Sequence, residues 1–338
     1  MRYQLFGRTG LRVSELALGA MTFGTKKWGA DEAASAAMYA AYRDAGGNFL
    51  DTANEVYAEG RSEEIVGRLV ADHRDEVVIS TKYTFHAPGT KNANAAGNHR
   101  KSLRRSLESS LKRLGTDHVD ILWLHCWDET SAQEEVLRAL DDAVRQGKVL
   151  HIGVSNFPAW VVSRANMLAE LRGWTAYSGI QVEYNLIERS VERELLPMSQ
   201  ALDLTVCAWS PLASGLLSGK YADGSSDAKR LDVAPLKQVD ERSLAIARGV
   251  GELAKQIGRS SVAVALNWLR AKRGVIPLLG ARTIEQLHAN LACLEFTLEA
   301  EQLAKLDALS AFSPGYPHTF IARLRPMSTG GFHDQLDR

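Results

Sequence analysis

Short apolar runs alternate with amphipathic helical segments along almost the whole chain of 338 residues. One strand-and-helix unit recurs about every 30–40 residues, the spacing of parallel strands joined by helical crossovers. Eight apolar runs are expected to form strands: 16–20, 48–53, 77–83, 119–126, 150–156, 179–185, 204–212 and 275–281. Eight such units predict a closed α/β barrel of the (β/α)8, or TIM-barrel, type. A doubly wound open sheet is the alternative, but LFGRTG near the start leads into no helix and is no GxGxxG turn.

Three segments lie outside this repeat. Residues 2–15 alternate in polarity around two glycines, which predicts a hairpin that plugs one end of the barrel. A long polar segment, 213–240, follows the seventh strand, and an extra helix, 299–311, precedes a proline-containing tail. Nothing suggests a linker, so residues 1–338 are expected to form a single domain.

Composition excludes several classes of partner. Forty basic residues balance forty acidic ones, which gives no support to a nucleic-acid or membrane partner, and the basic helix 99–113 is interpreted as a solvated face. Three scattered cysteines and nine histidines show neither CxxC nor HExxH spacing, so no disulfide frame and no metal site is expected. The start lacks the apolar run of a signal peptide, and a cytoplasmic location is expected.

Polar residues recur where the expected strands end. Asp51 and Tyr57 lie in DTANEVY after one apolar run, Lys82 follows VVIST, and His125 follows VDILWL. Each alone is as easily a turn former or a structural residue. Because the carboxyl ends of barrel strands share one mouth, we expect the four to meet there.

The four residue types complement one another chemically. A lysine ammonium beside a phenol favours the phenolate and lowers its pKa, and a carboxylate can hold the lysine in place. A histidine can orient a carbonyl. The set suits delivery of a proton to a developing alkoxide while another group delivers hydride.

Other strand ends suit a nicotinamide cofactor. Ser155, Asn156 and Gln181 carry the donors and acceptors that a carboxamide needs, although they could equally cap loops. Trp209 offers a flat face for a nicotinamide ring, or is a core residue. Arg282, at the start of the last repeat helix, suits a 2′-phosphate and favours NADPH over NADH.

The chain resembles the aldo-keto reductases over almost its full length. The resemblance rests on an ordered series of motifs: DTANEVY, STKY, LHCWD, GVSNF, QVEYN, AWSPLASGLLSGKY and GARTIEQLHANL. The run AWSPLASGLLSGKY is similar to the bacterial and potassium-channel-β-like branches. The family implies an NADPH-binding barrel that reduces small aldehydes or ketones. It implies that Tyr57 donates the proton, Lys82 lowers the pKa of Tyr57, Asp51 fixes Lys82 and His125 orients the carbonyl.

The resemblance also implies a set of cofactor contacts. These are Gly19, Ala20, Met21, Asp51, Ser155, Asn156, Gln181, Trp209, Ser210, Pro211, Leu212, Ser214, Gly215, Lys220, Arg230, Gly280, Arg282, Gln286 and Asn290. Lys220 is expected at the pyrophosphate, and Arg230 at a phosphate from a loop that folds over the cofactor. Ala289 stands where many related sequences have glutamate, which removes one expected adenine contact.

Aromatic residues on the segments expected at the mouth suggest an apolar or aromatic carbonyl substrate. The expected pocket comprises Phe23, Trp28, Tyr57, His125 and Trp127. The tail around Tyr316 and Phe320 is expected to join it.

One spacing departs from the family pattern. Three residues, Asn54, Glu55 and Val56, separate DTA from Tyr57 where the family has two, so the loop must bulge to bring Tyr57 to the same point. Glu55 is the second candidate acid there, but a solvated glutamate is the expected role.

Two other functions fit parts of the pattern. A nicotinamide-binding regulatory protein with weak catalysis is compatible with the altered spacing, whereas an intact His125 argues against it. A barrel lyase that uses Lys82 as a Schiff-base nucleophile would have no need for Trp209 or Arg282.

Overall fold

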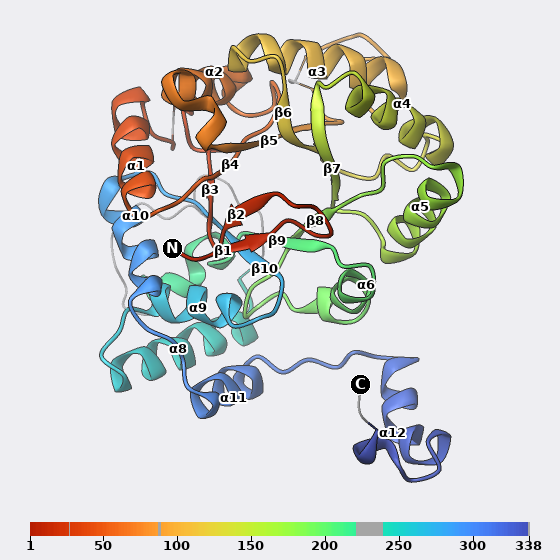
Figure 1. Ribbon diagram of the computed structural model, residues 1–338. Helices are drawn as coiled ribbons and strands as arrows, with labels where there is room; N and C mark the ends of the chain where they lie inside the picture. The colour runs from red at the N-terminus through yellow and green to blue at the C-terminus, as the bar shows by residue number, and fades with distance from the viewer. Residues whose placement is uncertain (27, 87–88, 221–238, 337–338) are drawn as a thin grey trace.

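A closed barrel of eight parallel strands forms the centre of the computed structural model, which describes residues 1–26, 28–86, 89–220 and 239–336. Neighbouring strands follow chain order, and β10 closes the ring against β3 (Figure 1). The strands are β3 (Ala17–Gly19), β4 (Phe49–Asp51), β5 (Val78–Tyr83), β6 (Val119–Leu124), β7 (Val149–Ser155), β8 (Gly179–Glu183), β9 (Thr205–Trp209) and β10 (Val275–Leu279). The predicted barrel is confirmed.

Helices surround the barrel on its outer side (Figure 1). They are α1 (Glu32–Asp44), α2 (Arg61–Val70), α3 (Arg100–Leu114), α4 (Gln133–Arg145), α5 (Ala159–Arg172), α6 (Leu195–Ala201), α8 (Glu241–Gln256), α9 (Ser261–Arg270) and α10 (Ile284–Leu291), followed by α11 (Ala300–Leu309). Asp31 caps α1 as its sequence predicts. Arg61 is the first residue of α2, and the hydroxyl of the next residue, Ser62, donates to the carbonyl of Ala20.

The expected hairpin closes the amino-terminal end of the barrel. Its strands, β1 (Tyr3–Leu5) and β2 (Arg12–Ser14), pair antiparallel. Phe6, at the turn, is fully buried and packs edge-on against Phe49 and Trp123, with ring centroids 6.3 and 5.9 Å away. Chemistry is therefore left to the opposite, carboxyl end of the strands.

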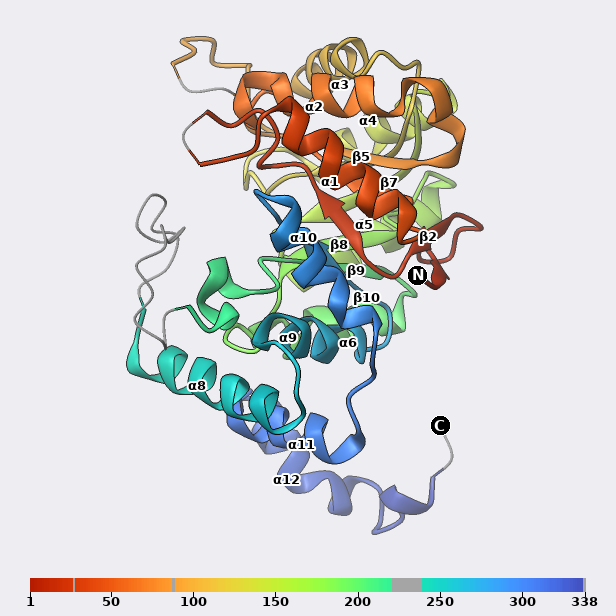
Figure 2. The same ribbon diagram turned by 90° about the vertical axis from the view of Figure 1, so that its left-hand side faces the viewer.

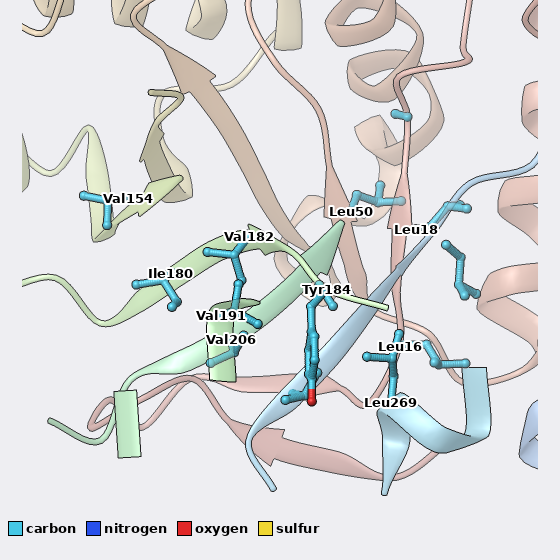
Figure 3. Close-up of a cluster of buried hydrophobic side chains, with 14 of the residues drawn as sticks. Leu16, Leu18, Leu50, Val154, Ile180, Val182, Tyr184, Val191, Val206 and Leu269 are labelled. Atoms are coloured by element: carbon cyan, nitrogen blue, oxygen red, sulfur yellow. The ribbon is translucent and has the colours of Figure 1, made fainter. Parts of the chain in front are cut away.

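The larger core lies between the strands and the helices. Leu18, Leu50, Ile180 and Val206, from four different strands, belong to it (Figure 3). Because helices cover a parallel barrel, the outward side chains of its strands are as apolar as the inward ones. This packing fixes the strand ends that carry the polar residues.

The tail does not reach the mouth. After α11 the chain forms α12 (His318–Ser328), which lies apart from the barrel and turns away from the mouth (Figure 2). Tyr316 is 84% exposed, its ring centroid lies 6.2 Å from that of Phe320 in a tilted arrangement, and His318 contacts Glu194. The expectation that this tail lines the substrate pocket is wrong.

Within the described ranges, no helix has the length and apolar character needed to cross a bilayer.

Candidate active site

A buried ion pair between Asp51 and Lys82 is the centre of the mouth. Asp51 ends β4, and Lys82 lies on the adjacent strand β5 with its side chain inside the barrel. The Lys82 ammonium donates to Asp51 Oδ2 and, at 2.7 Å, to the carbonyl of Thr52. Asp51 Oδ1 accepts from Ser80 Oγ at 2.7 Å and Gln181 Nε2 at 2.9 Å. These contacts leave both charges compensated and their positions fixed.

The pair keeps Lys82 charged. Burial alone would lower the pKa of Lys82, but the attraction of Asp51 and Tyr57 outweighs it, and the pKa is raised above its ordinary value. A lysine held as an ammonium is a cation and a donor, and it is a poor nucleophile.

The lengthened loop brings Tyr57 to this lysine. A turn between the Tyr57 amide and the Asn54 carbonyl, 3.1 Å, absorbs the additional residue. Three left-handed residues follow, Ala58, Glu59 and Gly60, with φ of 52°, 59° and 91°. Lys82 Nζ lies 5.3 Å from the centroid of the Tyr57 ring. The bulge expected from the sequence therefore still places the phenol beside the ammonium.

His125 directly follows β6, and its ring contacts that of Tyr57. The two rings meet edge to face with centroids 6.0 Å apart, and Phe85 lies 4.8 Å from the imidazole. Burial, and then the charge of Lys82, lower the pKa of His125 to about 3, so the ring is neutral at physiological pH. In the described part of the chain its Nδ1 is buried without a hydrogen-bond partner. An unsatisfied polar atom here fits a site that is completed by a ligand.

Asn156 ties three strand ends together. Its side chain donates to the carbonyl of His125 and to Ser155 Oγ, both at 2.9 Å, and accepts from Trp209 Nε1 at 3.2 Å. Its φ of 56° is left-handed, a conformation that asparagine tolerates better than most residues. The expected carboxamide contacts are thus brought together, with Asn156 bound to its neighbours and Gln181 bound to Asp51.

A groove beside the mouth gathers most of the remaining predicted cofactor residues. It is lined by Thr22, Trp28, Ser210, Pro211, Leu212, Ser214, Gly215, Ser218, Lys220, Val262, Gly280, Ala281, Arg282, Gln286, Ala289 and Asn290. Four of these were missed by sequence reasoning: Thr22, Ser218, Val262 and Ala281. Thr22 follows strand β3 by three residues and bonds the carbonyl of Ala281 at 2.7 Å, so its strand-end position was a usable signal. Val262, on α9, carries no such signal.

Three predicted cofactor residues from the end of β3, Gly19, Ala20 and Met21, do not line this groove. Gly19 pairs with Asp51 across β3 and β4, and Ala20 donates its amide to the Asp51 carbonyl, so both adjoin the ion pair. The Met21 carbonyl accepts from Thr25 within its own loop. Arg230 lies outside the described residues.

The expected substrate pocket is only partly assembled. Phe23 is fully buried in the core, because its loop turns inward and its backbone bridges to Ala30; its assignment to the pocket is wrong. Trp28 lines the groove described above. Trp127 packs edge-on against Trp160 at 5.7 Å and lines a separate surface groove. Phe85, 42% exposed and beside His125, was missed, although it follows β5 by two residues.

The geometry defines an α/β-barrel protein with a cluster of ionisable side chains at the carboxyl end of its strands. The sequence profile of the aldo/keto reductase family matches residues 15–311, and this chain belongs to that family. It is therefore a member of a family of carbonyl and alcohol oxidoreductases.

Named relatives agree with this membership. The chain is 36% identical to the putative aryl-alcohol dehydrogenase AAD14 of Saccharomyces cerevisiae, over 95% of this chain and 89% of the relative. It is 35% identical to norsolorinic acid reductase of Aspergillus flavus, over 94% and 83%. It is also 35% identical to aryl-alcohol dehydrogenase [NADP(+)] of Phanerodontia chrysosporium, over 93% and 87%.

Proposed function

We propose that this protein uses NADPH to reduce an aromatic aldehyde or ketone to an alcohol, with Tyr57 as the proton donor. The observation that carries the proposal is the contact of the Tyr57 ring with both the Lys82 ammonium and the neutral His125 ring. A cation beside a phenol makes it a stronger acid, and an acid is needed where a carbonyl oxygen gains charge.

Each side chain has a distinct role in the proposal. Asp51 holds Lys82 charged and in place. Lys82 favours loss of the Tyr57 proton to the substrate oxygen. His125, neutral because of its burial, donates one N–H to that oxygen and orients it. Bound NADPH supplies the hydride.

The residues present fit such a cofactor. Ser155, Asn156, Gln181 and Trp209 are proposed to hold its nicotinamide end, next to the catalytic cluster. Ser210 to Gly215 and Lys220 would hold the pyrophosphate, while Arg282, Gln286 and Asn290 would hold the phosphorylated adenosine. The amino terminus of α10 and the Arg282 guanidinium both favour an anion. Arg230 is proposed as a further phosphate contact.

Exposed aromatic surface supports an aromatic substrate. Phe85 presents its ring next to His125, where a flat substrate can pack. Two relatives are named for aryl alcohols, which agrees with this choice.

Lys82 is a poor candidate for Schiff-base chemistry. Its raised pKa and its two acceptors hold it as an ammonium, and an amine must be neutral to attack a carbonyl.

The test is fluorescence titration with NADPH and NADH, followed by NADPH oxidation with a panel of aromatic and aliphatic aldehydes. We expect tight NADPH binding, turnover of aromatic aldehydes, and loss of turnover in Tyr57→Phe with NADPH affinity retained. Tight binding without turnover of any carbonyl would favour the regulatory protein. Absence of nicotinamide binding would contradict both functions.

A further inference from the structure

Four charged residues, one of them in the Tyr57 loop itself, meet outside the barrel. We call Glu55, Glu63, Arg105 and Arg113 the loop clamp. Its two carboxylates and two guanidiniums balance in charge, and Glu63 is fully buried. The proposed reaction leaves all four unused.

Glu55 attaches the lengthened loop to helix α3. It precedes Tyr57 by two residues, and its side chain is only 15% exposed. Glu55 Oε1 accepts from Arg105 at 3.1 Å, and Oε2 lies 3.6 Å from a guanidinium nitrogen of Arg113. The expectation of a solvated glutamate is therefore wrong, and the sequence could not reveal this because α3 lies about 50 residues further along the chain.

Arg113 extends the connection to the strand that carries Lys82. Its guanidinium binds Glu63 at 2.6 and 2.7 Å, and Glu63 accepts from Thr81 Oγ1 at 2.6 Å. Thr81 precedes Lys82 on β5, with its side chain on the outer face of the barrel. One guanidinium thus joins the Tyr57 loop to the Lys82 strand.

The stem of Arg113 also packs against the far side of the loop. A Cβ added at Gly60 would lie 2.7 Å from Arg113 Cδ, so only glycine admits this approach. Gly60 also adopts a left-handed φ of 91°. Arg113 therefore contacts the chain both before and after Tyr57.

We propose that Glu55, through Arg105 and Arg113, is a positioning residue that holds the one-residue-longer loop so that Tyr57 stays beside Lys82. This inference rests on the proposed function. An additional residue widens the conformations open to a loop. The Glu55–Arg113 pair, with side chains 15% and 18% exposed, restricts them with little screening by salt.

The experiment replaces Glu55 by the isosteric glutamine, with Glu59→Gln as the matched control. Glu59 lies in the same loop and is exposed. In Glu55→Gln we expect kcat to fall about 5–10-fold, because Tyr57 leaves its productive position. The Kd for NADPH and the Tm should stay at the wild-type values, and Glu59→Gln should match the wild type throughout.

A second readout is independent of turnover. The ultraviolet difference spectrum between each variant and its Tyr57→Phe counterpart isolates ionisation of one tyrosine among nine. A phenol further from Lys82 ionises at higher pH, so the midpoint should rise in Glu55→Gln and stay constant in Glu59→Gln.

An unchanged midpoint in Glu55→Gln overturns the inference, whether kcat is unchanged or falls together with Tm. If wild-type protein turns over and Tyr57→Phe does not, such a result leaves the proposed function intact. If the wild type fails to turn over any carbonyl, the proposed function fails, and the midpoint still decides whether Glu55 positions Tyr57.

Discussion

Lys82 Nζ lies 5.3 Å from the centre of the Tyr57 ring, and the same ammonium is bound to the buried Asp51 carboxylate. The two neighbours act on Lys82 in the same direction, since both raise its pKa. The lysine consequently stays protonated, and in the proposed reaction the phenol beside it gives up its proton. This division lets one residue carry fixed charge and another carry the mobile proton.

Replacement of Lys82 by methionine should abolish turnover and destabilise the fold by about 3–5 kcal/mol, because it leaves a buried carboxylate without its cation. Urea denaturation measures the second effect. The double variant Asp51→Asn with Lys82→Met removes both charges and should regain most of the stability but none of the activity. A double variant as unstable as the single one would contradict this account.

His125 should make the protein sensitive to acid. Its pKa is about 3 when folded and near 6.5 when unfolded, so the unfolded state binds more protons between these values. Stability is thus retained above pH 6.5 and lost as pH falls toward 3, by at most about 3 kcal/mol at pH 4. Urea denaturation at pH 7 and pH 4 should show a smaller decrease in His125→Gln, which has no group to titrate there.

Asn156→Gly should weaken NADPH binding about tenfold, because Trp209 and the His125 carbonyl each lose a hydrogen bond to Asn156. Glycine accepts the left-handed backbone, so Tm should change little. Asn156→Ala removes the same bonds but also strains φ, and it should lower Tm as well. Equal Tm values for the two variants would argue against backbone strain at this position.

Arg282→Met should raise the Kd for NADPH about 10–100-fold, because one charge-assisted hydrogen bond is lost. The Kd for NADH should be unchanged. Arg282→Lys keeps the charge, so its Kd for NADPH should lie between those of the wild type and Arg282→Met. Fluorescence titration with both cofactors measures the ratio. Equal weakening for NADPH and NADH would show that Arg282 supports the groove and does not read the 2′-phosphate.

Phe6→Ala should destabilise the fold by about 3–5 kcal/mol, because it removes the aromatic contacts with Phe49 and Trp123 and leaves a cavity. Below the unfolding transition kcat should equal that of the wild type, since the plug is at the opposite end from Tyr57. Phe6→Leu fills more of the space and should lose less stability. A reduced kcat in the folded variant would show that the two ends are coupled.

The barrel and the four central residues were predictable because both follow from strand repeats. A strand-and-helix period determines the topology, and a shared carboxyl end determines which polar residues meet. Asp51, Lys82 and His125 needed no further information. The sequence also identified Tyr57 as a candidate. The turn and the left-handed residues that bring its ring to Lys82 are visible only in the structure.

Other parts of the site depend on contacts that sequence spacing does not encode. Phe23 and Phe85 both lie on segments at the mouth, yet one side chain turns into the core and the other toward His125. The direction of a loop side chain depends on the packing around it, which local pattern cannot supply. Pairing of Glu55 with Arg113 depends in the same way on the approach of a distant helix.

The plug formed by Phe6 has a consequence for the order of events at the mouth. Because side chains fill the barrel and the hairpin closes its floor, reactants can arrive and depart only by one entrance. A cofactor whose reactive ring lies against the strand ends would sit beneath the carbonyl compound. Under the proposed function, the deeper molecule is the cofactor. It would bind first and leave last, so release of the oxidised cofactor would follow departure of the alcohol.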